Sequence, residues 1–130
     1  MRCLRCGLCC MNTEMELSNR DIMRIERLGY DPKEFVMIRG GIPYLRNVNG
    51  YCYFYDRASR RCRIYRYRPL GCRIYPVIYV YGEGVSVDRL CPMHGTVSKD
   101  ELRRKASILL KLIKEIDKER AIRLHSCSVS

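Results

Sequence analysis

Four of the nine cysteines in this 130-residue chain fall within its first ten residues, and this cluster constrains the fold more than any other feature. They are Cys3, Cys6, Cys9 and Cys10, in the spacing Cys-x-x-Cys-x-x-Cys-Cys. A tight turn brings residues i and i+3 together, and Gly7 allows the backbone conformations that such a turn needs. Three thiolates of this loop can therefore converge on one point, as ligands of an iron–sulfur cluster do. Adjacent side chains diverge, so we expect one of Cys9 and Cys10 to face a second site or another side of the first.

Metal ligation and disulfide formation are the two alternatives for so many cysteines. Their content approaches that of small cross-linked domains. No apolar segment of the signal-peptide type follows Met1, and no apolar run is long enough to span a bilayer. We therefore expect a cytoplasmic protein, without membrane insertion, whose thiols stay reduced and bind metal. A disulfide-rich protein of a hyperthermophile is the alternative.

Eight cysteines form the candidate metal-ligand set, because eight thiolates suit two sites of four. The set is Cys3, Cys6, Cys9, Cys10, Cys52, Cys62, Cys72 and Cys91. Cys127 stands alone in a polar tail, and we expect it to be a free thiol. Structural zinc sites generally use two Cys-x-x-Cys pairs, whereas the four ligand candidates after residue 50 are isolated. The N-terminal triplet is closer to ferredoxin-type ligation, so the pattern favours an iron–sulfur cluster of the 4Fe-4S type over zinc.

The hydrophobic pattern predicts a small, metal-stabilised α+β domain with short antiparallel hairpins and two short helices. Ser18 and Asp21 cap the first helix, which ends at Gly29, and Asp31-Pro32 begins a second helix that ends at Gly40-Gly41. Short strands are expected over residues 42–44, 51–55, 62–65, 77–81 and 84–87, with Asn-Gly at residues 49–50 in a hairpin connection. Pro69 cannot continue a sheet, so we expect a turn or a single helical turn that presents Cys72.

A long amphipathic helix is predicted over residues 98–124. Ser98 and Glu101 form a capping box at its start. An apolar stripe follows at helical spacing, made of Leu102, Ala106, Leu109, Ile113 and Ile116. We expect a cysteine-cluster domain over residues 1–97 with this helix packed on it, and a dimer seam is the alternative.

A basic segment suggests a second kind of partner. The chain has a net charge of +11, and residues 57–73 hold seven arginines, no acidic residue, and the tyrosines Tyr65 and Tyr67. Arginine for phosphate and tyrosine for base stacking is a combination typical of nucleic-acid binding. We favour the other interpretation, a solvated basic face whose arginines balance the charge of a thiolate cluster. Arg68 and Arg73 would either donate hydrogen bonds to cluster sulfurs or bind an anionic partner.

Catalytic residues are not apparent. The sequence contains no visible Ser/His/Asp set, and its carboxylates are scattered without an obvious pair. His94 could replace a thiolate ligand, but we expect a surface histidine, and His125 has no evident partner. Whether the protein is an enzyme is therefore left open, and its partner is an unidentified protein or redox partner.

Taken in order, the motifs resemble a known family. They are Cys3-x-x-Cys6-Gly7-x-Cys9-Cys10, Cys52-x-Phe54, Cys62-Arg63-Ile64-Tyr65-x-x-Arg68-Pro69-x-x-Cys72-Arg73-x-Tyr75-Pro76 and Cys91-Pro92. This pattern is similar to the YkgJ-type cysteine-cluster family of zinc- or iron-chelating CxxCxxCC domains. The resemblance covers about residues 3–92 and implies that the eight named cysteines coordinate metal, without implying a reaction. A flagellin lysine N-methylase carries the same motif, which keeps a methylase-related enzyme among the alternatives.

Overall fold

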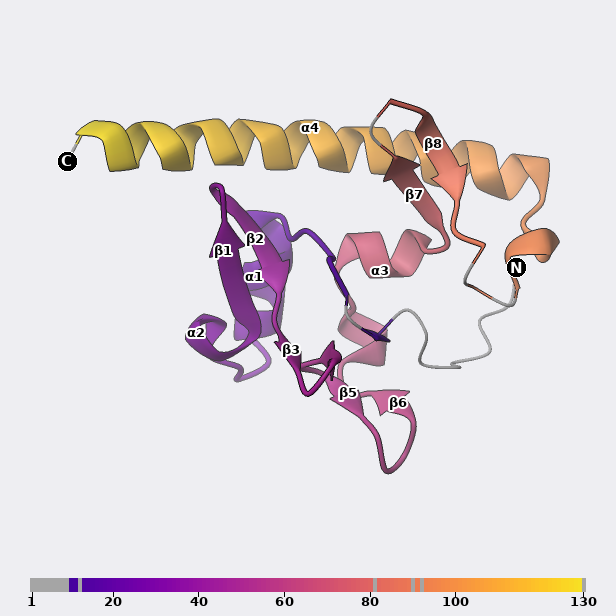
Figure 1. Ribbon diagram of the computed structural model, residues 1–130, viewed down its shortest axis with the longest axis horizontal. Helices are drawn as coiled ribbons and strands as arrows, with labels where there is room; N and C mark the ends of the chain where they lie inside the picture. The colour runs from indigo at the N-terminus through magenta and orange to yellow at the C-terminus, as the bar shows by residue number, and fades with distance from the viewer. Residues whose placement is uncertain (1–9, 12, 81, 90, 92, 130) are drawn as a thin grey trace.

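The computed structural model describes residues 10–11, 13–80, 82–89, 91 and 93–129, with residues 126–129 described by their backbone alone. Its elements, in order, are α1 (Asn19–Glu26), α2 (Pro32–Phe35), β1 (Val36–Arg39), β2 (Ile42–Leu45), β3 (Asn47–Val48), β4 (Tyr51–Cys52), β5 (Tyr55–Asp56), β6 (Arg61–Cys62), η2 (Tyr65–Tyr67), α3 (Leu70–Ile74), β7 (Val77–Val80), β8 (Gly84–Val87), η3 (His94–Thr96) and α4 (Lys99–Val129). This is the predicted α+β class, with short antiparallel hairpins and a long C-terminal helix (Figure 1).

Each hairpin of the described residues is a separate two-stranded antiparallel sheet, pairing β1 with β2, β3 with β4, β5 with β6 and β7 with β8. Asn49 and Gly50 join β3 to β4 with φ angles of 52° and 83°, the left-handed backbone that a tight hairpin turn of this kind requires. Two-residue strands such as β4 and β6 are not stable alone. Their stability must therefore come from packing and from whatever their side chains bind.

The second predicted helix is shorter than expected. It ends at Phe35, and residues 36–39 instead form β1, which turns back through Gly40 and Gly41 to pair with β2. The reason is tertiary pairing, because Val36 and Ile38 are β-branched residues that find a partner strand at residues 42–45. The strand predicted at 62–65 is also wrong beyond Cys62, where the chain enters η2.

Two hydrophobic clusters stabilise the fold. The first gathers buried side chains from α1, α2 and the hairpins: Leu17, Ile25, Phe35, Leu45, Cys52, Phe54 and Ile64. The second joins Ile74 of α3, Val77 of β7 and Leu109 of α4. Cys52 therefore belongs to the first cluster, and Cys62 and Cys72 pack against it.

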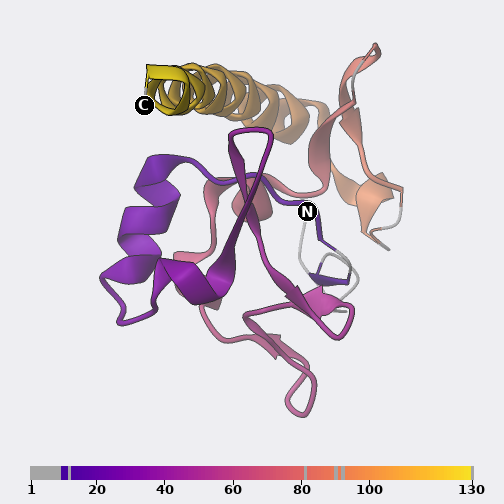
Figure 2. The ribbon, with the colours of Figure 1, turned by 60° about the vertical axis from the view of Figure 1, so that its left-hand side comes forward.

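The long helix α4 runs along one side of the molecule, past the β1–β2 hairpin, α3 and the β7–β8 hairpin, as the two ribbon views show (Figures 1 and 2). Its first half packs on α3 and β7, and Leu109, Leu112 and Ile116 are buried. Its second half makes polar contacts with α1 and with the tip of the β1–β2 hairpin, including a bidentate pair between Arg20 and Glu115 at 2.7 and 2.8 Å. Among the helices within the described residues, none is both long and apolar enough to cross a membrane.

Candidate metal centre

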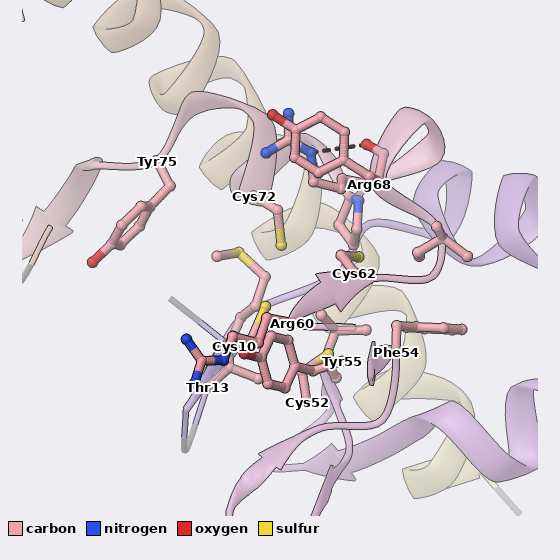
Figure 3. A pocket seen from close by; sticks show the side chains of 15 residues that line it. Cys10, Thr13, Cys52, Phe54, Tyr55, Arg60, Cys62, Arg68, Cys72 and Tyr75 are labelled. Atoms are coloured by element: carbon pink, nitrogen blue, oxygen red, sulfur yellow. Dashed lines mark hydrogen bonds between the residues drawn. The ribbon is translucent and has the colours of Figure 1, made fainter. Parts of the chain in front are cut away.

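Four of the predicted ligands, Cys10, Cys52, Cys62 and Cys72, line one cavity of about 50 Å³. They come from four segments: the N-terminal segment before α1, strand β4, strand β6 and helix α3. Their sulfur atoms turn toward a common space in the close view (Figure 3). A sequence pattern with ten-residue intervals between three of these cysteines thus becomes a single cluster of thiol groups.

Hairpin pairing places the first three of these cysteines. Cys52 pairs with Asn47 across β3 and β4, and Cys62 pairs with Tyr55 across β5 and β6. Met11, next to Cys10, forms an isolated bridge to Tyr51, next to Cys52. These backbone pairs bring the N-terminal segment and the two small hairpins to the same side of the cavity.

A buried carboxylate positions the fourth cysteine. Asp21 is 1% exposed, and its Oδ1 accepts a hydrogen bond from the backbone N–H of Leu70, the first residue of α3, at 3.1 Å. Arg24 forms an ion pair with Asp21 at 2.9 Å and donates a second hydrogen bond to the carbonyl of Arg68. Helix α1 therefore fixes both the approach to α3 and its first turn, which carries Cys72. The sequence analysis assigned Asp21 only to the cap of α1, because nothing local indicates its contact with a residue 49 positions away.

Gly71, directly before Cys72, allows close packing at the cavity wall. A Cβ atom at this position would overlap the sulfur of Met15, which also lines the cavity. The absence of a side chain at Gly71 therefore lets α3 approach the segment that follows Cys10.

The remaining wall is mostly apolar and aromatic, with two arginines. Phe54, Ile64 and Leu45 contribute apolar surface. Arg68 lines the cavity, lies 3.9 Å from the ring centroid of Tyr65 and donates from Nε to the Tyr65 carbonyl. Arg60 lines it from the β5–β6 turn, where its φ angle is 55°. The cationic groups at its edge favour anionic sulfur ligands, whereas the apolar wall excludes water and by itself disfavours their charge.

The other candidate ligands lie elsewhere. Cys91 is buried at 8% exposure but does not line this cavity, and its carbonyl contacts Nδ1 of His94 at 2.8 Å. Cys3, Cys6 and Cys9 lie outside the described residues, as does the side chain of Cys127. The rings of His94 and His125 are exposed, in line with the expected surface position of His94. Arg73 is exposed, and its Nη2 donates to the carbonyl of Arg66 rather than lining the cavity.

The donor set fits a thiophilic metal. Sulfur ligands of this type select zinc, copper(I) or iron–sulfur clusters over magnesium or calcium. Within the described part of the chain, however, no three side chains of His, Cys, Asp or Glu are arranged to hold a single metal ion. The four cysteines therefore share one cavity without converging on one ion-sized point.

Comparison with known proteins agrees with this chemistry. The chain belongs to the CxxCxxCC family, described as a "putative zinc- or iron-chelating domain", whose model matches residues 2–103. The protein is therefore assigned metal binding, by zinc or iron chelation. It is also 34% identical over 80 residues to an uncharacterized protein of Methanocaldococcus jannaschii, an alignment that covers 57% of this chain and 43% of that relative. No solved structure matches the chain.

Proposed function

We propose that the protein carries an iron–sulfur cluster of the 4Fe-4S type in a structural or electron-transfer role. The observation that supports this most is the cavity lined by Cys10, Cys52, Cys62 and Cys72. A 4Fe-4S cluster takes four cysteine thiolates, which is the number that the cavity offers. When bound, the cluster would supply reversible one-electron chemistry or a rigid cross-link between four segments.

The spacing of these cysteines favours a cluster over zinc. A zinc ion binds each thiolate sulfur at about 2.3 Å, so four ligands of one ion must crowd around a single point. The described cysteines are not arranged that way. A cluster of several iron atoms bridges a wider gap between its ligands, and a cavity of about 50 Å³ admits more than one water-sized occupant.

The other four predicted ligands, Cys3, Cys6, Cys9 and Cys91, form a second thiolate set in this proposal. Cys91 is buried and is not among the residues that line the cavity of the first set.

The residues around the first set have defined tasks in this proposal. Phe54, Ile64 and Leu45 keep water from the thiolates, and the guanidinium groups of Arg60 and Arg68 offset their negative charge. Burial, nearby charge and hydrogen bonds to sulfur set the reduction potential of a cluster. Asp21 and Arg24 hold Cys72 in place through α3.

The first test is anaerobic purification, followed by an absorption spectrum and counts of iron, sulfide and zinc on the same sample. A brown protein that contains iron and sulfide in equal amounts and has a broad absorption band at about 400 nm supports the proposal. A colourless protein that contains zinc alone overturns the cluster and leaves a structural zinc site.

Serine substitutions test the ligand assignment. We expect Cys62→Ser to lose most of the metal of the first set and to destabilise the hairpins, because metal binding and folding are coupled. Cys127→Ser, the matched control, should leave metal content unchanged, and Cys91→Ser should leave the Cys62 set loaded. Metal loss in Cys127→Ser, or full metal content in Cys62→Ser, would contradict the assignment.

A further inference from the structure

The arginine-rich segment has more positive charge than the cysteine cavity uses. Of its seven arginines, Arg60 and Arg68 line the cavity. The other five are exposed and lie outside it: Arg57, Arg61, Arg63, Arg66 and Arg73, here called the arginine face. Within the described residues, none of the five forms an ion pair with a carboxylate. Balancing a thiolate cluster therefore accounts for the two arginines that line the cavity, and the charge of the arginine face lies outside it.

The arginine face borders an open hollow of about 350 Å³ next to the cysteine cavity. Arg57 and Arg63 line this hollow together with Tyr51, Tyr53 and Tyr55. Arg73, on α3, donates a hydrogen bond to the carbonyl of Arg66 at 2.8 Å and lies outside this hollow. Planar rings and guanidinium groups thus share one concave surface.

Three of these groups form a stack. The rings of Tyr51 and Tyr55 lie 5.2 Å apart and only 14° from parallel. The guanidinium of Arg57 lies over Tyr51 at 4.8 Å from the ring centroid. Arg57 is exposed, so its outer side is open at the end of the stack. Guanidinium planes and tyrosine rings are the groups on which proteins stack unpaired bases.

The acidic groups near the hollow already accept hydrogen bonds from neighbouring residues. Asp56 accepts hydrogen bonds from the Ser59 hydroxyl and the Ala58 N–H, and these bonds lower the pKa of its carboxyl. Its charge therefore stabilises the β5–β6 turn beside Arg57 and Arg63. The Tyr53 hydroxyl donates to Glu34, which raises the pKa of that phenol and keeps it neutral.

We propose that the arginine face and the adjoining hollow bind single-stranded nucleic acid. The arginines contact phosphate groups, and a base stacks on the exposed guanidinium of Arg57 at the end of the Tyr51–Tyr55 stack. A single strand fits better than a duplex, because only an unpaired base presents its face to such a platform. This binding goes beyond metal chelation and does not depend on which metal the cysteines hold.

The charge contribution is tested with the metal-loaded protein and labelled RNA and DNA strands of mixed sequence, about 12 nucleotides long, at several salt concentrations. The variant is Arg57→Gln/Arg61→Gln/Arg63→Gln. The control, Lys111→Gln/Lys114→Gln/Lys118→Gln, removes the same charge from exposed positions of α4. We expect the arginine variant to bind at least about tenfold more weakly and to lower the slope of log affinity against log salt by about 2, while the control stays near wild type.

The stacking contribution is tested by exchanging charge-equivalent residues. Arg57→Lys keeps the charge and removes the plane, so affinity should fall about fivefold or more with an unchanged salt slope. Arg61→Lys, exposed and outside the stack, should have no such effect. Metal content, measured on every variant, must equal that of wild type, so that a disturbed cavity is not mistaken for lost contact.

Three results would overturn the proposal. The first is the absence of binding by the wild type to either strand at low salt. The second is an equal loss in the arginine and lysine variants, which would indicate a nonspecific polycation. The third is equal binding of a polyglutamate peptide, which would indicate an acidic protein partner instead. Tighter binding of either RNA or DNA supports the proposal and identifies the type of strand.

Discussion

At the scale of single residues, Asp21 connects parts of the chain that the sequence keeps far apart. It completes the capping box of α1 with Ser18, pairs with Arg24 and accepts the first N–H of α3. An almost fully buried carboxylate is tolerated because each of these partners compensates for lost hydration. Its loss would leave the Arg24 charge half-buried and α3 without its anchor.

We therefore expect Asp21→Ala to lower the free energy of unfolding by about 3 kcal/mol and to weaken metal retention. The matched control is Asp31→Ala, which removes the exposed cap of α2, where Asp31 accepts from Lys33, and should cost about 1 kcal/mol. Urea unfolding and metal content, measured on both variants, provide the check. Equal metal retention in the two would show that Asp21 does not position Cys72.

The candidate site could be predicted in part from single residues. Their number and spacing predicted eight cysteines as metal ligands, and four of those named line one cavity. Their grouping was not predictable, because Cys10 comes near Cys52 through long-range contacts such as the bridge between Met11 and Tyr51. Such a contact depends on hairpin packing, which no local pattern encodes.

At the scale of elements, the tip of the β1–β2 hairpin lies directly under the second half of α4. Gly40 and Gly41 form this tip with φ angles of 58° and 81°. Arg120 donates to the carbonyl of Gly40 and Arg123 to that of Gly41. A Cβ at Gly41 would lie 2.9 Å from the side chain of Leu124, whereas one at Gly40 would meet nothing within 4 Å.

The two glycines therefore offer a matched pair. In both alanine variants the left-handed backbone destabilises the protein by about 1 kcal/mol. In Gly41→Ala the new Cβ atom also overlaps the Leu124 side chain of α4. We expect Gly41→Ala to destabilise the protein by about 1 kcal/mol more than Gly40→Ala, measured by urea unfolding. Adding Leu124→Ala should remove most of that difference, and failure to do so would mean that α4 does not pack on the hairpin.

Elements with strong local signals were predicted well. The capping box of α1, the Asn49-Gly50 turn and the β7–β8 hairpin all have local causes. The Val36–Arg39 segment was assigned wrongly to a helix, because its strand state depends on pairing with Ile42–Leu45. The segment after Cys62 was also assigned wrongly to a strand, whereas the helical turn expected after Pro69 is present as α3, which carries Cys72.

At the scale of the whole molecule, the two hydrophobic clusters differ in their contacts with the cysteines of the cavity. The first contains Cys52 and packs against Cys10, Cys62 and Cys72, and its hairpins have strands of two residues. The second joins α3, β7 and α4 through Ile74, Val77 and Leu109. Metal removal should consequently destabilise the first cluster more than the second.

We expect hydrogen exchange after metal removal by an anaerobic chelator to rise by about tenfold or more across residues 47–66. Residues 102–116 of α4 should change much less, because their packing on β7 involves none of the cavity cysteines. Mass spectrometry of peptic fragments would measure both regions in one sample. Uniform exchange throughout the chain would indicate one cooperative unit that unfolds as a whole.

The order of the cavity-lining cysteines along the chain also bears on how the protein is made. The last of the four, Cys72, precedes the end of α4 by 57 residues, since that helix runs to Val129. At about 5 to 20 residues per second, synthesis of that remainder takes roughly 3 to 11 s. All four cysteines of the cavity therefore exist before α4 is complete. Metal delivery during translation would therefore meet a nascent chain in which α4 has not yet packed on α3.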